Sequence, residues 1–293
     1  MDILITLIGA GALGKALSYS LTQVTGYDVR LHARSGFIQE PFDVLDHGVS
    51  KTVQVKGDAS GDSPIYIFTT KAYDLSSALE EWLPRIPTTA RIVLLSNGYI
   101  EPLLFPLRKK FPNHRLTKGV VTRGARFLPT GQLQLSDQGH ISWGDEQGAR
   151  DFETQIFAQR AELKWDAGSC EARKDKWYCN TVLNTLCGAY RLVKNGLALE
   201  HPEFEALSKE VFALSGELWP ERSTSFTRER LHTLAKNLIN ATSGNENSMA
   251  VDVRLGRRTE IDVLSGVAKT CANYELKFPL LMKMHKQIES SKI

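Results

Sequence analysis

A stripe of polar side chains follows one face of a predicted helix that begins near Arg173. Lys176, Asn180 and Asn184 are four residues apart, so each is displaced only about 40° around the helix from the one before. Their neighbours are mostly apolar, which predicts a largely buried helix. Because a buried amide without a partner costs on the order of 1–3 kcal/mol, we expect the stripe to bind a polar substrate. The alternative is a stripe that faces solvent.

Two further polar side chains follow predicted strands. Lys71 comes directly after the run at 65–70, and Asn97 follows the run at 92–95. Open α/β sheets bind ligands at the carboxyl ends of their strands, so both residues are candidate ligand contacts. Asn97-Gly98 is also a common turn sequence, and ordinary loop chemistry is the alternative for both positions.

The amino-terminal segment has a glycine pattern typical of dinucleotide binding. The apolar run at 3–8 leads directly into Gly9-Ala10-Gly11-Ala12-Leu13-Gly14, and a helical pattern follows. The first glycine of such a loop permits a tight turn, and the second lets the backbone approach a pyrophosphate. The third lets the helix pack closely on the strand. We predict that residues 9–14 bind a dinucleotide, the alternative being an ordinary glycine-rich turn.

The end of the second predicted strand indicates which dinucleotide the chain binds. Units that prefer NAD usually end this strand with an acidic residue that binds the ribose hydroxyl. Here the strand at 27–33 is followed by Arg34-Ser35-Gly36, and a cation beside a hydroxyl suits a 2′-phosphate. We therefore predict NADP(H), with a solvated surface arginine as the alternative interpretation of Arg34.

The elements that must position these residues alternate in the first half of the chain. The predicted strands are residues 3–8, 28–33, 64–70, 91–95 and 116–122, with helices near 12–25, 74–83 and 99–111. Such alternation indicates a mostly parallel sheet covered by helices. Two short alternating runs, 131–136 and 139–144, predict a strand meander at the edge of the sheet.

Helical spacing dominates the rest of the chain. The predicted helices are residues 171–193, 203–217, 227–241, 249–273 and 279–290. Asp166–Ser169 is a plausible linker, so we expect a dinucleotide-binding domain at 1–167 and an all-helical domain at 168–293. The cleft between two such domains is the default place for an active site.

Ser248, just before the helix predicted at 249–273, and Glu260 within it pose a geometric question. On one continuous helix, Ser248 and Glu260 would lie about 120° apart, too far for a single narrow stripe. Both reach one site only if Ser248 lies at or before the start of the helix, or if the site wraps around it.

Composition excludes several functional classes. The chain has 293 residues and a net charge of +3, with no basic run interleaved with aromatics, so we expect neither a nucleic-acid nor a membrane partner. Its four cysteines, Cys170, Cys179, Cys187 and Cys271, lack metal-ligand spacing. No apolar stretch approaches transmembrane length. We expect a cytoplasmic protein with reduced cysteines and no metal at its site.

Taken together, these motifs resemble the ketopantoate reductase (2-dehydropantoate 2-reductase) family over nearly the whole chain. The resemblance rests on the glycine loop, on Arg34, Lys71 and Asn97-Gly98, on the stripe at 176–184, and on the run from Asn245 to Asp262. It implies a Rossmann-like α/β domain followed by an all-α domain of the 6-phosphogluconate dehydrogenase C-terminal type. It also implies NADPH-dependent reduction of 2-dehydropantoate to D-pantoate in pantothenate biosynthesis.

The resemblance further implies a role for each residue. Lys176 matches the family's general acid and Glu260 its partner carboxylate, which orients the lysine or binds a substrate hydroxyl. Asn180, Asn184 and Ser248 match substrate-binding positions. Lys71 and Asn97 match residues lining the nicotinamide end of the cofactor site, Asn97 also touching substrate, and Arg34 matches the residue on the 2′-phosphate.

Two segments depart from the family pattern. Tyr99-Ile100 replaces a smaller turn, and Leu280-Leu281 replaces a polar start of the last helix. Both departures leave the substrate open among 2-oxo acids. The alternatives are a reductase of another 2-oxo or hydroxy acid, and a non-catalytic NADP-binding sensor, for which Lys176 and Glu260 would be unnecessary. The expected assembly is a monomer or a homodimer.

Overall fold

The computed structural model describes residues 2–57, 62–136, 139, 141–143, 163–165, 169–221, 224 and 226–291. The chain forms two compact units. The first contains Met1–Ser96 and Glu101–Arg173, and the second contains Asn97–Ile100 and Lys174–Ile293. The predicted linker lies outside the described residues except for Ser169, so the boundary at 167/168 stays a prediction.

An eight-stranded sheet forms the centre of the first unit, in the order β12-β11-β8-β7-β6-β1-β2-β3. The five strands predicted from apolar runs are confirmed and lie parallel to one another: β1 (Ile3–Ile8), β2 (Tyr27–Ala33), β6 (Ile65–Phe68), β7 (Arg91–Leu94) and β8 (Leu116–Val121). The antiparallel pairs lie outside them: β3 (Gly36–Phe37) pairs with β2, and β11 (Ile141–Trp143) pairs with β8. Beyond β11 lies β12 (Leu163–Trp165), parallel to it.

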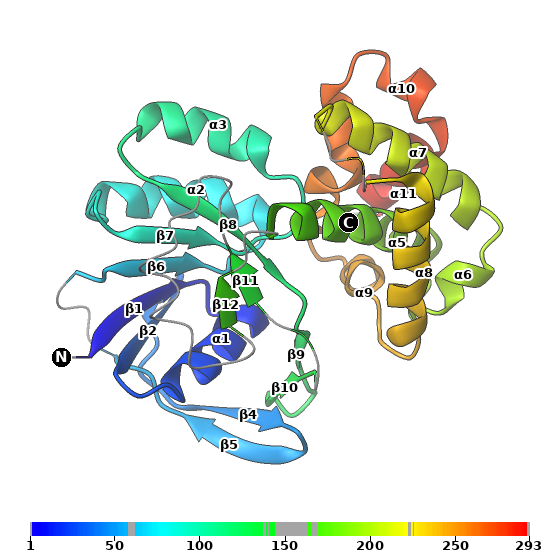
Figure 1. The fold of residues 1–293 in the computed structure, drawn as a ribbon. Helices are drawn as coiled ribbons and strands as arrows, with labels where there is room; N and C mark the ends of the chain where they lie inside the picture. Colours follow the sequence, from blue (N-terminus) through cyan, green and yellow to red (C-terminus); the bar gives the residue numbers. More distant parts are fainter. Residues whose placement is uncertain are drawn as a thin grey trace. The chain divides into compact units, whose positions relative to one another are not determined.

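The strand order reverses direction at β1. The chain moves from β1 to β2 on one side and from β6 through β7 to β8 on the other. The crossover connections put α1 (Ala12–Thr22) on one face of the sheet, with α2 (Ala72–Trp82) and α3 (Glu101–Lys110) on the opposite face (Figure 1). Such a switch point is where open α/β sheets bind ligands at the carboxyl ends of their strands.

A smaller sheet of four strands covers α1, in the order β5-β4-β10-β9. Its strands are β4 (Phe42–Asp46), β5 (Val49–Val53), β9 (Ala125–Phe127) and β10 (Leu133–Leu135). The predicted meander is therefore wrong: β10 belongs to this sheet, and β11 pairs with β8 in the large one. Alternation in 131–136 correctly indicates that Leu133 and Leu135 are buried. It carries no information on the partner strand, because non-local packing decides pairing.

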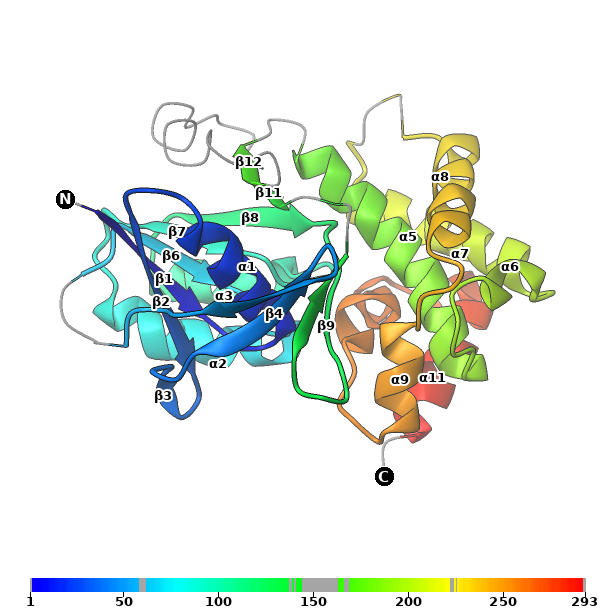
Figure 2. The same ribbon diagram turned by 90° about the horizontal axis from the view of Figure 1, so that it is seen from below.

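The second unit is helical. Its helices are α5 (Ser169–Tyr190), whose first turn belongs to the first unit, α6 (Leu197–Glu200), α7 (Phe204–Leu218), α8 (Arg228–Ala241), α9 (Ser248–Arg254), α10 (Tyr274–Lys277) and α11 (Pro279–Ser290). Figure 2 shows α5 passing among α7, α8, α9 and α11. Tyr178, Val182 and Leu186 on α5 are completely buried in the core of this unit.

The helix predicted at 249–273 is wrong. Helix α9 ends at Arg254, and Gly256 follows in the left-handed conformation with φ +62°. The chain then forms two 3₁₀ segments, η2 (Ile261–Val263) and η3 (Ser265–Thr270). Left-handed backbone cannot continue an α-helix, and glycine adopts it without steric cost. Ser248 is therefore the first residue of a short helix, and Glu260 lies beyond the end of that helix.

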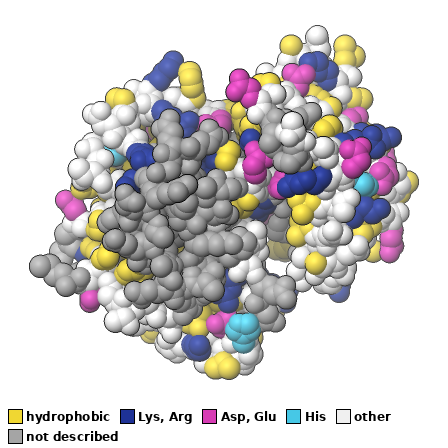
Figure 3. Space-filling view, in the orientation of Figure 1, with side chains coloured by type: hydrophobic (Ala, Val, Ile, Leu, Met, Phe, Trp, Pro, Cys, Tyr) yellow, Lys and Arg dark blue, Asp and Glu magenta, His cyan; other side chains and the backbone are white. Residues whose placement is uncertain are grey.

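Charges on the visible surface of the helical unit are mixed in sign (Figure 3). The ion pairs of this unit include Lys283–Glu203 and Lys277–Glu217. Within the described ranges, no helix combines the length and the apolar composition needed to cross a bilayer.

Candidate active site

A lysine, an asparagine and a glutamate are joined by hydrogen bonds in the second unit. Lys176 Nζ donates to Asn97 Oδ1 at 2.8 Å, and Asn97 Nδ2 donates to Glu260 Oε2 at 3.2 Å. Asn97 precedes Lys176 by 79 positions and Glu260 by 163 positions in the sequence, and all three residues are half-buried. The fold thus brings both predicted catalytic residues together through the amide of Asn97.

The segment 97–100 reaches this position by close packing on η2. Gly98 has φ +88°, and a Cβ there would lie 2.4 Å from Cγ2 of Val263. The amide of Tyr99 donates to the carbonyl of Val263 at 2.8 Å. Trp177 Nε1 donates to the same carbonyl at 3.2 Å. One carbonyl therefore fixes both the residue next to Lys176 and the segment that carries Asn97.

The ammonium of Lys176 has an unusual acidity. Loss of hydration on burial lowers the pKa of Lys176 to about 8, and the negative charge of Glu260 partly opposes this shift. A pKa close to neutrality suits a group that donates a proton during the reaction and takes it up again afterwards. Lysine is well adapted to this role because its compact ammonium changes pKa readily when it is buried.

The other residues of the predicted stripe have different surroundings. Asn184 Oδ1 accepts a hydrogen bond from Asn247 Nδ2 at 3.0 Å, so the protein itself provides a partner for it. Asn180 is half-buried and makes no side-chain hydrogen bond to any described residue, which leaves its amide available to a ligand. The protein itself therefore provides partners for Lys176 and Asn184, and substrate binding by the stripe stays a prediction.

Asn247 is a structural residue that the sequence analysis missed. Its Oδ1 accepts from the amide of Ala250 at 3.1 Å and caps α9, while its Nδ2 also donates to Asn195 Oδ1 at 3.1 Å. Ser248 is exposed and has no hydrogen-bond partner in the described part of the chain. The preference of helix N-caps for asparagine could have identified Asn247. Its cap starts α9 so that Ser248 is the first helical residue.

The glycine loop of the first unit has the geometry that dinucleotide binding requires. Gly9 has φ +115°, and a Cβ on Gly14 would lie only 1.8 Å from the carbonyl oxygen of Gly9. A Cβ on Gly11, by contrast, would meet no described atom within 4 Å. The loop is thus tightly packed at its first and third glycines and open at the second, where a pyrophosphate would approach.

Thr69 supports this loop and was not singled out from the sequence. Its Oγ1 donates to the carbonyl of Gly9 at 2.7 Å, which joins the end of β6 to the turn after β1. Within the described residues, no side chain caps the amino terminus of α1, and Gly11 is its N-cap. The free amides of that first turn and the helix dipole favour an anion.

Arg34 and Lys71 lie at the carboxyl edge of the same sheet. Arg34 follows β2 with its side chain 84 % exposed, and its Nη2 pairs with Asp74 Oδ2 of α2 at 2.5 Å. Lys71 is exposed and is the N-cap residue of α2. The structure therefore puts Arg34 on the surface as a cation paired with the carboxylate of Asp74.

The segment that carries Asn97 takes part in a series of aromatic contacts through Tyr99. The ring of Tyr99 meets that of Trp219 edge to face, with centroids 5.4 Å apart, and Trp219 meets Trp177 in the same way at 5.2 Å. Trp177 is buried, whereas Tyr99 and Trp219 are half-buried. The departure Tyr99 thus adds aromatic surface two residues from Asn97. Leu280 packs against the helical core, and Leu281 is buried within it.

Known proteins resemble the chain over nearly its whole length. A family model described as ketopantoate reductase PanE/ApbA matches residues 5–148, and the model for the C-terminal part of that family matches residues 170–288. The 2-dehydropantoate 2-reductase of Yersinia pestis is 26 % identical over 277 residues, which cover 89 % of this chain and 86 % of that protein.

Solved structures share the fold. A dimeric ketopantoate reductase from Staphylococcus aureus has a TM-score of 0.79 at 16 % identity, with 99 % of both chains covered. A D-mandelate dehydrogenase, solved with NADH and anilino(oxo)acetate, has a TM-score of 0.80 at 19 % identity and covers 99 % of this chain and 98 % of its own. At these identities the likeness concerns the fold.

Proposed function

Because this chain belongs to the ketopantoate reductase family, we propose that it reduces 2-dehydropantoate to D-pantoate with NADPH. The family consists of dinucleotide-dependent oxidoreductases that act on CH–OH groups. The observation that carries the proposal is the hydrogen-bonded series Lys176–Asn97–Glu260, in which the pKa of the lysine is lowered to about 8. A protein that only bound the cofactor would not need such a group.

In this proposal Lys176 is the general acid. A bound reduced nicotinamide supplies a hydride equivalent for the carbonyl carbon. As charge develops on the carbonyl oxygen, the ammonium of Lys176 stabilises it and donates a proton to it. Asn97 holds Nζ through its carbonyl oxygen and is in turn held by Glu260, so the lysine keeps one orientation. The side chains of Asn180 and Ser248, which make no hydrogen bond to a described residue, would bind polar groups of the substrate.

The first unit would hold the cofactor. Residues 9–14 offer an open backbone at Gly11 and the uncapped start of α1 for the pyrophosphate. Arg34 would exchange its contact with Asp74 for the 2′-phosphate. Lys71, at the start of α2, would lie toward the nicotinamide end. We further propose a monomer or homodimer, which light scattering on the purified protein tests.

The substrate is tested by following the loss of NADPH absorbance with 2-dehydropantoate and a panel of other 2-oxo acids. We expect turnover of 2-dehydropantoate, and Lys176→Ala should lower kcat by about 10²–10⁴-fold, the usual contribution of a general acid. Lys209→Ala, which removes an exposed lysine of α7, is the matched control and should leave kcat unchanged. Intact NADPH binding without turnover of 2-dehydropantoate would contradict the proposed substrate.

The preference for NADPH is tested by Arg34→Ala. Loss of the guanidinium should weaken NADPH much more than NADH, because only NADPH carries the 2′-phosphate. Asp74→Asn is the companion variant: it removes the carboxylate that competes for Arg34 and should strengthen NADPH binding. Equal dissociation constants for the two cofactors in the wild-type protein, measured by fluorescence titration, would overturn the assignment.

A second candidate function has its own observation. The half-buried rings of Tyr99 and Trp219 near Asn97 would favour a 2-oxo acid that carries an aromatic group, such as phenylglyoxylate. The structural similarity to a D-mandelate dehydrogenase is consistent with this substrate class. A higher kcat/KM for phenylglyoxylate than for 2-dehydropantoate, reversed by Tyr99→Ala, would favour the second candidate.

A further inference from the structure

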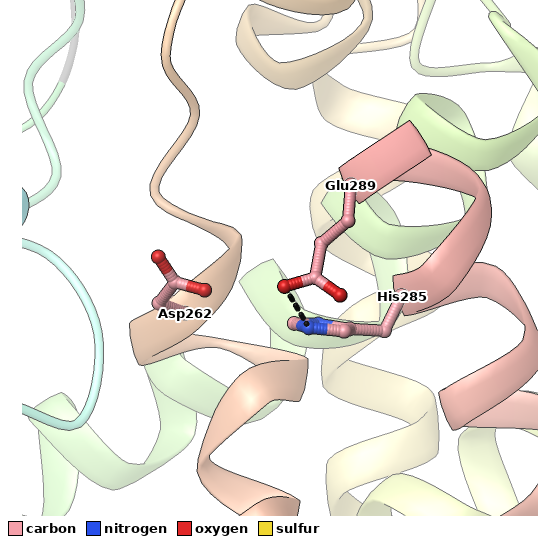
Figure 4. Close-up of side chains that lie close together, drawn as sticks. All are labelled: Asp262, His285 and Glu289. Carbon is pink, nitrogen blue, oxygen red and sulfur yellow. Dashed lines mark ion pairs between the residues drawn. The ribbon is translucent and has the colours of Figure 1, made fainter. Parts of the chain in front are cut away.

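Three side chains that the proposed reaction does not use lie together in the helical unit. They are Asp262 on η2, and His285 and Glu289 one turn apart on α11. One ligand atom from each lies within 4.8 Å of the other two. Figure 4 shows the carboxylate of Glu289 paired with the His285 ring and the carboxylate of Asp262 on the neighbouring η2 segment.

The imidazole of His285 is oriented in a way that is typical of a metal ligand. Its Nδ1 lies 2.9 Å from Ser265 Oγ, and the side chain is completely buried. Its Nε2 lies 3.2 Å from Glu289 Oε1, and this carboxylate contact does not meet the geometric criteria for a hydrogen bond within the described residues. A hydrogen bond at one ring nitrogen commonly fixes the tautomer that presents the other nitrogen to a metal.

The distances suit a small divalent cation. Two ligand atoms bound at about 2.0–2.1 Å to a tetrahedral Zn²⁺ lie about 3.3 Å apart, close to the 3.2 Å between His285 Nε2 and Glu289 Oε1. Asp262 is exposed and has no ion pair or hydrogen bond within the described chain, so its side chain is able to rotate toward the other two. A single nitrogen with two carboxylates is a donor set that Zn²⁺ and Co²⁺ accept.

We propose that Asp262, His285 and Glu289 form a binding site for a divalent transition-metal ion such as Zn²⁺. The cation that now faces Glu289 is Lys269, whose Nζ lies 3.1 Å from Oε1. Lys269 is 41 % exposed, so it can move into solvent when the metal replaces its ammonium. The bound metal would connect η2, which directly follows Glu260, to the last helix, with the fourth coordination position open to water.

The test is titration of the EDTA-treated full-length protein with Zn²⁺ in a calorimeter, together with Co²⁺ absorption spectroscopy. We expect one Zn²⁺ per chain, a higher Tm with the metal, and the visible absorption of tetrahedral Co²⁺. Asp262→Asn and Glu289→Gln should each weaken Zn²⁺ binding by at least about ten-fold. Lys269→Gln should strengthen it, because the competing ammonium is gone. The Tm of each metal-free variant verifies that it folds.

Two control variants separate this site from other sources of zinc binding. His232 also lies beside a carboxylate, Glu205 at 3.0 Å, and His232→Gln should leave Zn²⁺ affinity unchanged. Cys271→Ser removes a half-buried thiol close to η3 and should likewise have no effect. Absence of binding, unchanged affinity in Asp262→Asn and Glu289→Gln, or loss of binding in either control would overturn the proposal.

Discussion

At the scale of single residues, burial and one neighbouring charge determine the acidity of Lys176. Loss of hydration lowers the pKa of its ammonium to about 8, and Glu260 limits the shift because a nearby negative charge favours the protonated form. Asn97 contributes an amide rather than a charge, so it orients the lysine and joins it to Glu260.

This environment predicts a pH dependence. Ketone reduction needs protonated Lys176, so kcat/KM should be highest below about pH 8 and should fall as the pH rises through the pKa of the lysine. In Glu260→Gln the charge that raises this pKa is lost, so the fall in kcat/KM should move to lower pH. Stopped-flow rates across the pH range measure the shift.

A parallel titration of NADPH affinity serves as the control for that experiment. It should lack the same dependence, because residues 9–14 and Arg34, which are proposed to bind the pyrophosphate and the 2′-phosphate, lie in the other unit. A falling limb that stays in place in Glu260→Gln would show that another group controls it.

At the scale of elements, the loop between β1 and α1 combines close packing with one open position. Gly14 brings the first turn of α1 against the carbonyl of Gly9, which also accepts from Thr69. Gly11 faces open space. The two glycines therefore differ in what a methyl group would disturb, although both belong to the same short motif.

Alanine substitutions at these glycines should have separable effects. Gly14→Ala would bring a Cβ to 1.8 Å from a backbone oxygen and should destabilise the fold by about 1–3 kcal/mol or more. Gly11→Ala should change stability by less than about 1 kcal/mol. It should nevertheless weaken dinucleotide binding, because the methyl group occupies the approach of the pyrophosphate. Urea unfolding and cofactor titration measure the two effects, and normal cofactor affinity in Gly11→Ala would contradict the assignment of this loop.

At the scale of the whole molecule, the chain contributes four residues from its first half to the helical unit. Asn97–Ile100 lie in the connection between β7 and α3, but they pack with the stretch Lys174–Ile293. This packing brings Asn97 to Lys176 and Glu260, so the proposed catalytic group depends on both halves of the sequence.

The packing of Asn97–Ile100 in the helical unit predicts that Gly98→Ala lowers activity without loss of cofactor binding. The new Cβ would overlap Val263 in a backbone conformation with φ +88°, so the segment should be displaced, with a cost of about 1–3 kcal/mol. Asn97 would then no longer hold Lys176, and kcat should fall, whereas most of the NADPH affinity should remain because residues 9–14 and Arg34 are unchanged.

Gly26→Ala is the matched control for this variant, because Gly26 has φ +87° and open space around its Cβ position. It carries the conformational strain without the overlap, and its kcat should remain at the wild-type level. Equal activity of Gly98→Ala and the wild-type protein would show that the segment does not position the lysine.

The sequence alone determined the features that rest on local, periodic signals. The glycine loop at 9–14, the five parallel strands and the buried helix with Lys176 all follow from residue spacing, because backbone geometry repeats along each element. The family resemblance added Glu260, which spacing on one assumed helix could not assign.

Only the tertiary structure decided which distant segments meet. It paired β10 with β4, ended α9 before Gly256, made Asn247 the cap of α9, and brought Asn97 and Asp262 to their neighbours. These outcomes depend on contacts between residues far apart in the chain, whose energies no local pattern records. Propensity predicted the elements, and packing selected their partners.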